Sequence, residues 1–242
     1  GGGNKDYRTH LKTDGLQGKR IGVLESFFGD KEENLGVSKQ VKEATRYLEE
    51  GGATLVSIDE EIDSDWIVKE VSVHLDDFKT HVGSYLGELP EDYPVHSLQD
   101  VLDSGKYHPG VKENMETAVK LDVGTPPYNE KIIRQEELRM RILNIMAEND
   151  LDAMVYAHQQ QLVCKTGGSQ KQRNGALCSA TGFPSIAVPA GFVPSEEAPL
   201  GVPVGMEIMG RPFREDILIE IAYAFEQLSQ YRQAPDLSLF EN

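Results

Sequence analysis

The sequence predicts an α/β fold, because a strand–helix–strand unit near the N-terminus is followed, from residue 150 onward, by a second region of alternating strands and helices. The first strand is predicted at 19–24, a short apolar run. Four apolar residues then recur at helical spacing on one face: Val37, Val41, Ala44 and Leu48. Gly51 and Gly52 are typical of a helix C-terminus, and 53–58 is apolar again. We therefore expect a βαβ unit with two parallel strands.

The middle of the chain has a different pattern. Residues 59–149 combine helical periodicity, many acids and repeated prolines, which predicts a mainly helical insertion. Ser97 fits a helix N-cap and Gly105 fits the end of the same helix. The segment 128–149 predicts a long helix whose buried stripe consists of Leu138, Ile142, Ile145 and Met146.

Residues 150–242 predict a strand-rich core with a closing helix. Apolar runs at 151–157, 185–189 and 202–210 predict three strands. The segment 214–229 predicts a helix with a stripe of Leu218, Ile221, Ala222, Phe225 and Leu228. At the other end of the chain, residues 1–18 are polar and rich in glycine, and we expect them to form a loop or linker lead-in.

Charge and cysteine content exclude several classes of protein. Lys and Arg number 24 against 40 Asp and Glu, a net charge of -16, which disfavours nucleic acid and anionic membranes as partners. No apolar run approaches the roughly 20 residues of a membrane span. Cys164 and Cys178 lack metal-ligand spacing and fit reduced thiols of a cytoplasmic protein. His74 and His81, seven residues apart, do not by themselves make a metal site, so we expect no metal.

The stretch from His158 to Thr181 is the most unusual in the chain. It follows the carboxyl end of a predicted strand, where ligand sites of α/β proteins form, and it is rich in amide side chains, which both donate and accept hydrogen bonds. It therefore suits a polar, uncharged ligand such as an amide, although an ordinary polar surface loop is the alternative. A nucleophile could be Ser169 with a nearby lysine, or Cys178 with His158, but the spacing supports neither pair.

Five blocks of the C-terminal region carry a family resemblance. They are Gly-Phe-Pro at 182–184, Val-Pro-Ala-Gly-Phe at 188–192, Pro-Val-Gly at 203–205, Gly-Arg-Pro-Phe at 210–213 and Ala-Tyr-Ala-Phe-Glu-Gln at 222–227. In this order and spacing they resemble the amidase signature family of serine amide hydrolases. Segments 16–23 and 51–56 also look like that family, whereas 60–150 matches only in general character. The resemblance implies the C-terminal half of the amidase signature fold, an open mixed β-sheet flanked by helices, over residues 19–242.

The resemblance also implies catalysis by a Ser, cis-Ser and Lys triad, whose lysine acts on the nucleophile through the bridging serine. The serines come from a Gly-Gly-Ser-Ser type motif and a later Gly-Gly-Ser-x-Arg motif, both upstream of the strand at 20–24. This chain has no two adjacent serines, and its one Gly-Gly-Ser, ending at Ser169, lies on the wrong side of that strand. We therefore expect no catalytic residue here, and a catalytic half that precedes Gly1.

These implications predict the C-terminal portion of an amidase that hydrolyses carboxylic amides through an acyl-serine intermediate, without metal or organic cofactor. Gln159, Gln160, Arg173 and Asn174 are the candidate contacts to a small amide substrate. The expected partner is the missing N-terminal half or another copy of the chain. Two alternatives stay open: a non-catalytic binding or interaction module derived from the amidase fold, and an independent enzyme that uses Cys178 or Ser169.

Overall fold

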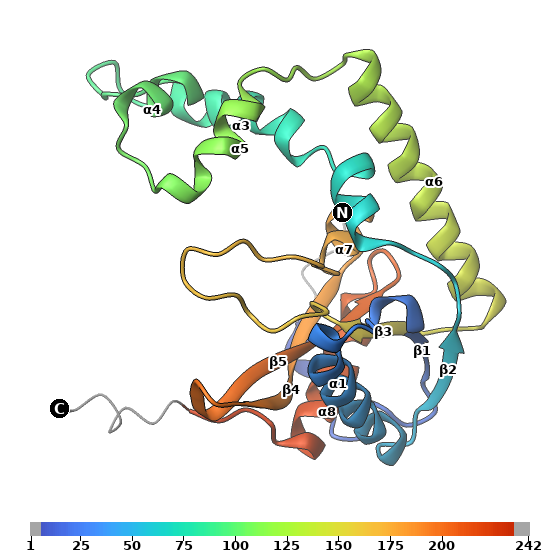
Figure 1. Cartoon of the computed structure of the whole chain (residues 1–242). Helices are drawn as coiled ribbons and strands as arrows, with labels where there is room; N and C mark the ends of the chain where they lie inside the picture. The colour runs from blue at the N-terminus through green and yellow to red at the C-terminus, as the bar shows by residue number, and fades with distance from the viewer. Residues whose placement is uncertain (1–5, 235–242) are drawn as a thin grey trace. The chain divides into compact units, whose positions relative to one another are not determined.

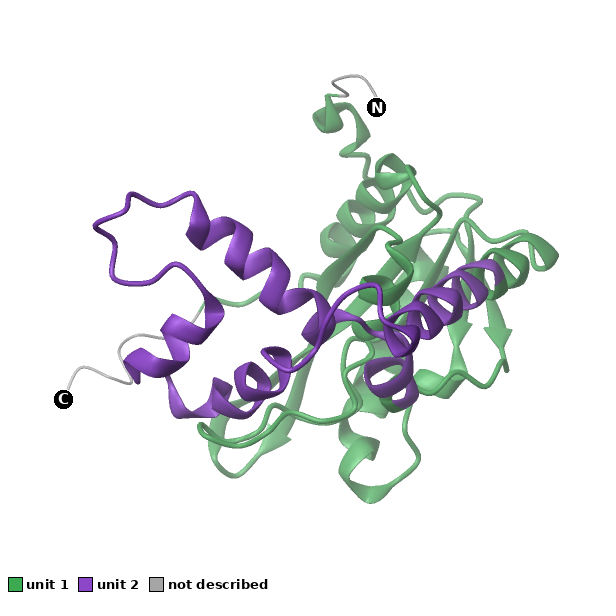
Figure 2. Cartoon of the chain, turned by 90° about the horizontal axis from the view of Figure 1, so that it is seen from above, with its two compact units in different colours: residues 1–65, 141–242 green, residues 66–140 purple. Residues whose placement is uncertain are grey.

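The computed structural model describes residues 6–234, which fall into two compact units (Figure 2). Unit 1 contains residues 1–65 and 141–242, and unit 2 contains residues 66–140. The segment predicted to be mainly helical, 59–149, includes the whole of unit 2.

Unit 1 is built on a five-stranded sheet with the order β2-β1-β3-β5-β4 (Figure 1). β1 is parallel to both β2 and β3, whereas β5 is antiparallel to both β3 and β4. The sheet is therefore open and mixed, as predicted. The strands are β1 (Arg20–Leu24), β2 (Thr54–Ile58), β3 (Ala153–Ala157), β4 (Ser185–Ser195) and β5 (Ala198–Gly210).

The βαβ prediction is confirmed. Helix α1 (Glu32–Glu50) joins β1 to the parallel strand β2, and its four stripe residues are all buried. Glu32 and Glu33 lie in its first turn, where acids are favoured by the positive end of the helix dipole. Gly52, just past its C-terminus, has φ +95°, a conformation that glycine adopts without a steric penalty.

Helices cover both faces of the sheet. Helix α8 (Glu215–Ser229) packs on the face that carries Gly210, where the side chain of Leu218 lies too close for a Cβ to fit without rearrangement. Helix α7 (Ala176–Thr181) lies on the opposite face, because Cys178 Sγ is 3.1 Å from the hydroxyl of Tyr156, whose side chain points away from the α8 face. Both faces of β3 are consequently buried, and the whole strand is inaccessible to solvent.

Two details of the C-terminal strands and helix differ from the sequence predictions. β4 and β5 are longer than expected, so Pro189 and Pro203 lie inside strands and not at their ends. Pro189 is tolerated at a register shift in the outermost described strand, and Pro203 lies in the part of β5 that pairs with β4 alone. Leu228 was placed on the buried stripe of α8, but it lies in the last turn and is 41% exposed.

The described part of the lead-in packs against α8. After the short helix η1 (Tyr7–His10), Glu220 Oε1 lies 2.9 Å from His10 Nδ1 and accepts a hydrogen bond from Lys12 Nζ at 2.8 Å. Leu16 is fully buried. Gly15 lies directly against the main chain of Glu220, with no room for a Cβ. The carboxylate of Glu220 on α8 and the buried Leu16 therefore both anchor the described part of the lead-in.

Unit 2 is helical, and Leu98, Met115 and Ala118 form a small buried cluster within it. The Ser97 hydroxyl accepts a hydrogen bond from the N–H of Asp100 at 3.1 Å, and Gly105 has φ +63°, which confirms both predicted ends of α4. The four stripe residues predicted on the long helix are buried. The elements of unit 2 are η3 (Ile67–Val71), α3 (His74–Gly87), α4 (Leu98–Ser104), η4 (Pro109–Val111) and α5 (Lys112–Ala118). α2 (Ser64–Trp66) and α6 (Pro126–Glu148) cross its sequence boundaries.

Within residues 6–234, none of the helices combines the length and the apolar character that a membrane crossing requires.

Candidate functional site

The carboxyl ends of β1 and β3 lie side by side, because the two strands are parallel neighbours. Helix η2 (Glu25–Phe27) follows β1, and the segment 158–174 follows β3. The chain leaves β1 toward β2 on one side and returns as β3 on the other, so this edge of the sheet is a topological switch point. Open α/β sheets bind ligands outside the strand ends at such points, which makes this edge the candidate site.

Asn174 holds the site together from inside. Its side chain is fully buried, and its Nδ2 donates to the carbonyl oxygens of Phe27 at 2.9 Å and Ala157 at 2.7 Å. Its Oδ1 accepts a hydrogen bond from Gln160 Nε2 at 3.1 Å. Asn174 thus joins the end of the segment to the chain that follows both parallel strands, and its amide group is engaged within the protein.

Gln160 belongs to the same buried network. It is 9% exposed, and its main-chain oxygen accepts a hydrogen bond from Asn34 Nδ2 at 3.0 Å. Asn34 also donates to Gln172 Oε1 at 2.7 Å. Asn34 was not among the residues that the sequence singled out, although it lies three positions before Val37 on the buried stripe of α1. A polar residue on such a stripe is the signal that could have identified it.

Gln159 and Arg173 lie on the accessible side of the segment. They form an antiparallel bridge, which places their side chains on the same side. Gln159 is half-buried and Arg173 is exposed. A cavity of about 240 Å³ adjoins Gln159, and its lining residues are His158, Gln159, Gln161, Leu162, Val163, Pro203, Val204 and Gly205. Of the four predicted substrate contacts, Gln159 lines a cavity and Arg173 lies opposite Gln159 in the bridge. Gln160 and Asn174 are buried in the interior.

His158 and Glu207 form a dyad next to this cavity. His158 Nδ1 lies 2.8 Å from Glu207 Oε2. The histidine side chain is 48% exposed, whereas the glutamate side chain is 4% exposed. Glu207 was not singled out from the sequence, although it is the one acid in the apolar run 202–210, and an acid inside a buried strand is the signal that was available.

The environment of the dyad keeps the glutamate ionised. Burial alone would raise the pKa of Glu207, but hydrogen bonds from His158 and Ser185, together with the charge of His158, hold that pKa below its ordinary value. The hydrogen bond with Glu207 in turn raises the pKa of His158, against the opposing effect of partial burial. An ionised carboxylate can only accept, so Nδ1 of His158 carries the proton of this bond.

Neither of the two nucleophile candidates, Cys178 and Ser169, is activated by the described residues. Burial, the largest cause, raises the pKa of the Cys178 thiol to about 12, and Nδ1 of His158 is engaged with Glu207. A buried thiol with a raised pKa is inert. Ser169 is exposed, and no described residue hydrogen-bonds to its hydroxyl.

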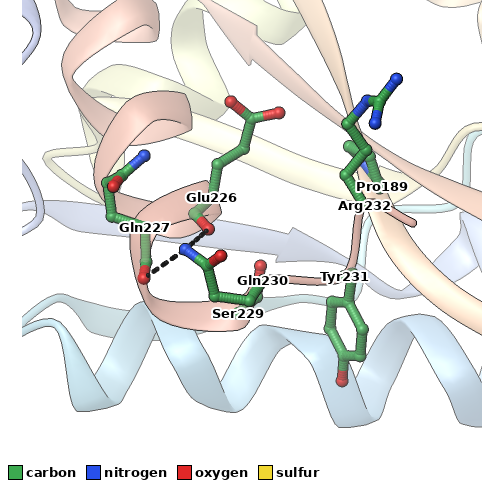
Figure 3. Close-up of a pocket in the computed structure, with 7 residues that line it drawn as sticks. All are labelled: Pro189, Glu226, Gln227, Ser229, Gln230, Tyr231 and Arg232. Carbon is green, nitrogen blue, oxygen red and sulfur yellow. Dashed lines mark hydrogen bonds between the residues drawn. The ribbon is translucent and has the colours of Figure 1, made fainter. Parts of the chain in front are cut away.

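Two further cavities lie elsewhere in unit 1. One of about 230 Å³ adjoins the last turn of α8, where Gln230 Nε2 donates to the carbonyl oxygens of Glu226 and Gln227 (Figure 3). The other, of about 380 Å³, is lined by Arg20, Arg211 and Arg214, among other residues. Arg211 of the Gly-Arg-Pro-Phe block donates there to the carbonyl oxygens of Met146 and Leu151, so this arginine has a structural role.

No metal centre is formed by the described residues. Across residues 6–234, no three His, Cys, Asp or Glu side chains are grouped so that they could hold a metal ion.

Comparison with known proteins gives consistent matches. The family model described as Amidase matches residues 4–219. The probable amidase At4g34880 of Arabidopsis thaliana is 30% identical over 243 residues, which are 95% of this chain and 42% of that protein. One subunit of the glutamyl-tRNA(Gln) amidotransferase of Thermoanaerobacter pseudethanolicus is 23% identical over 95% of this chain and 48% of that protein.

A solved structure matches over nearly the whole chain as well. The native peptide amidase of Stenotrophomonas maltophilia has a TM-score of 0.76 at 26% identity, and the match covers 98% of this chain and 48% of that one. The chain therefore spans about half the length of the relatives that it matches.

Proposed function

Because the chain belongs to the amidase family, we propose that it supplies the scaffold and part of the substrate pocket of an enzyme that hydrolyses carboxylic amides. The observation that carries this proposal is the family match over residues 4–219, which includes four of the five C-terminal blocks and ends before the fifth, at 222–227. The fold agrees with it, since a solved peptide amidase has the same architecture over nearly the whole chain.

The reaction that we propose passes through an acyl-serine intermediate, without a metal or an organic cofactor. This chain has no adjacent serines, and the environment of Cys178 disfavours a thiolate. In the proposal, the Ser, cis-Ser and Lys residues therefore come from a polypeptide segment other than residues 1–242. The contribution of this chain is to bind and position the amide.

Gln159 and Arg173 are the substrate contacts that the geometry favours. Both lie on the accessible side of the segment 158–174, and Gln159 lines a cavity. Gln160 and Asn174 serve the same pocket from beneath, because their buried hydrogen bonds fix the ends of the segment. An amide substrate could both donate to and accept from the Gln159 side chain.

We propose a catalytic polypeptide or a second copy of this chain as the partner. One relative is a subunit of an amidotransferase, and in the described part of the sheet the outer strands β2 and β4 each have a single neighbour. We further propose that the protein works in the cytoplasm, since both cysteines are free thiols.

The experiment is to express this chain alone and together with any coding sequence that is found upstream of Gly1, and to measure ammonia release from a panel of carboxylic amides. A fluorophosphonate probe would label the catalytic serine. We expect turnover and labelling only for the longer protein. Turnover by this chain alone that is lost in Ser169→Ala or Cys178→Ala would contradict the proposal, and so would a longer protein that neither turns over amides nor binds the probe.

A further inference from the structure

We propose that the cavity beside His158 binds a small carboxylate with a short apolar body, and that His158 and Arg173 are its two cationic hydrogen-bond donors. The inference rests on the proposed function and deepens it, because it names amides that carry a carboxylate as the substrate class. It is carried by four features: a fixed imidazole, a buried carboxylate behind it, a cavity of matching character and an unpaired arginine.

The His158 ring is held in place by its main chain and by a glycine. The His158 N–H donates to the Gly205 carbonyl at 3.0 Å, and its own carbonyl accepts from the N–H groups of Asn174 and Gly175 at 3.1 and 3.3 Å. A Cβ at Gly175 would come within 2.8 Å of His158 Cε1, so a side chain there would displace the ring. A donor that is fixed before the ligand arrives loses little conformational entropy on binding.

Glu207 makes the outer nitrogen of the ring available. Its carboxylate accepts from Nδ1, and no described residue is hydrogen-bonded to Nε2 of His158. The groups next to Glu207 on the other elements are Tyr156 on β3, Cys178 on α7 and Ser185 on β4, all of them neutral at neutral pH. Glu207 is the only charged group that shifts the pKa of His158, and it favours the imidazolium form, in which Nε2 is also a donor.

The cavity combines polar and apolar walls. Its volume is about 240 Å³, and its lining residues include the amide-bearing Gln159 and Gln161 and the apolar Leu162, Val163 and Pro203. Small-molecule sites in proteins combine apolar walls with a few polar groups in this way. A short branched alkyl group of the ligand matches the apolar part of the cavity, and an acceptor oxygen of the ligand matches the amides and the imidazolium.

Arg173 supplies a second positive charge. It is exposed and lies across the bridge from Gln159, which lines the cavity. None of the described residues forms an ion pair with it, whereas Lys165 of the same segment is paired with Glu197 at 2.7 Å. In a chain of net charge -16, an anionic ligand needs such a local excess of cations. Charge-assisted hydrogen bonds to a carboxylate are roughly twice as strong as neutral ones, which favours a carboxylate over a carboxamide.

The test is a binding titration of the full 242-residue chain, which needs no turnover. Isobutyrate is the probe, isobutyramide is its neutral match in shape, and the ionic strength is held constant. Long-range ¹H–¹⁵N spectra of the histidine rings follow His158. We expect a saturable shift of its Nε2 with isobutyrate and an affinity about tenfold weaker for isobutyramide. His158→Gln and Arg173→Gln should each weaken isobutyrate binding by about tenfold, and the exposed neighbour Lys171→Gln is the charge-matched control.

The pH profile provides a second readout that does not require a variant. Since the pKa of His158 is raised above 6.5, binding should persist above that pH and disappear as the pH rises through the pKa of the folded state. Absence of saturable binding overturns the inference, and so does equal affinity for the amide or an unchanged affinity in His158→Gln. Because no reaction is measured, this inference can fail while the longer protein is an active amidase, and it can hold while no amide is hydrolysed.

Discussion

Replacing Asn174 with alanine tests whether one buried amide holds the two parallel strands and the segment 158–174 together. The substitution removes two donors and one acceptor. It leaves the carbonyl oxygens of Phe27 and Ala157 and the Nε2 of Gln160 without these partners, all in a region closed to solvent. The expected result is a large loss of stability and faster local opening of the segment.

The magnitude follows from the three groups that lose a partner. An unsatisfied buried polar group costs about 1–3 kcal/mol. Three groups at the low end of that range amount to about 3 kcal/mol. For comparison, Gln159→Ala removes a half-buried side chain next to the network and should cost less than about 0.5 kcal/mol, as most surface substitutions do.

Urea unfolding followed by far-UV circular dichroism would measure the difference, and hydrogen exchange of the β3 amides would localise it to unit 1. Tryptophan fluorescence is unsuitable, because the only tryptophan, Trp66, belongs to unit 2. We expect the midpoint of Asn174→Ala to fall with an unchanged slope. A free energy of unfolding within about 0.5 kcal/mol of the wild type would refute the role assigned to this residue.

Three further outcomes are expected. Gly29→Ala should destabilise unit 1 by about 1–3 kcal/mol, because its methyl group would overlap the side chain of Asn34; urea unfolding measures this. The dyad should stabilise the fold most between pH 4.5 and 6.5. The contribution of Glu207 is lost as the pH falls through its lowered pKa, and the contribution of His158 is lost as the pH rises through its raised pKa. The pH dependence of the urea midpoint, compared between the wild type and His158→Gln, measures this effect. Glu220→Gln should loosen the lead-in and speed tryptic cleavage there about tenfold.

Matched variants separate these effects from nonspecific destabilisation. Gly83→Ala adds a methyl group in open space within helix α3 and should be neutral or stabilising, so equal losses at Gly29 and Gly83 would contradict the packing argument. Glu226→Gln removes an exposed acid from the same helix as Glu220 and should leave the cleavage rate unchanged. A His158→Gln variant whose midpoint keeps the wild-type pH dependence would count against the dyad.

The elements of unit 1 were predictable because their signals are local. The stripe from Val37 to Leu48, with glycines after it, specifies α1 by spacing alone, and the alternating run 202–210 predicts a strand. Pro189 and Pro203 misled the prediction of strand ends, since a proline indicates a boundary unless the pairing of neighbouring strands is known. That pairing depends on which strand lies at the edge, and no local pattern encodes it.

The candidate site was predictable only in part. Its location followed from the rule that ligands bind at the carboxyl ends of strands, and the amide-rich composition marked the right segment. The direction of each side chain did not follow, because Asn174 turns inward to bond Phe27, 147 positions earlier in the chain. Glu207 was passed over for the same reason, since its partner His158 is 49 positions away.

The contrast between the two cysteines offers a practical use. Cys178 is buried, and its thiol, with a pKa raised to about 12, should resist alkylation, whereas Cys164 lies half-buried in the segment beside the cavity. A maleimide dye should therefore attach to the native protein at one position, with no need to engineer a cysteine. Its emission would report directly whether this segment rearranges when a ligand binds or when a catalytic partner docks.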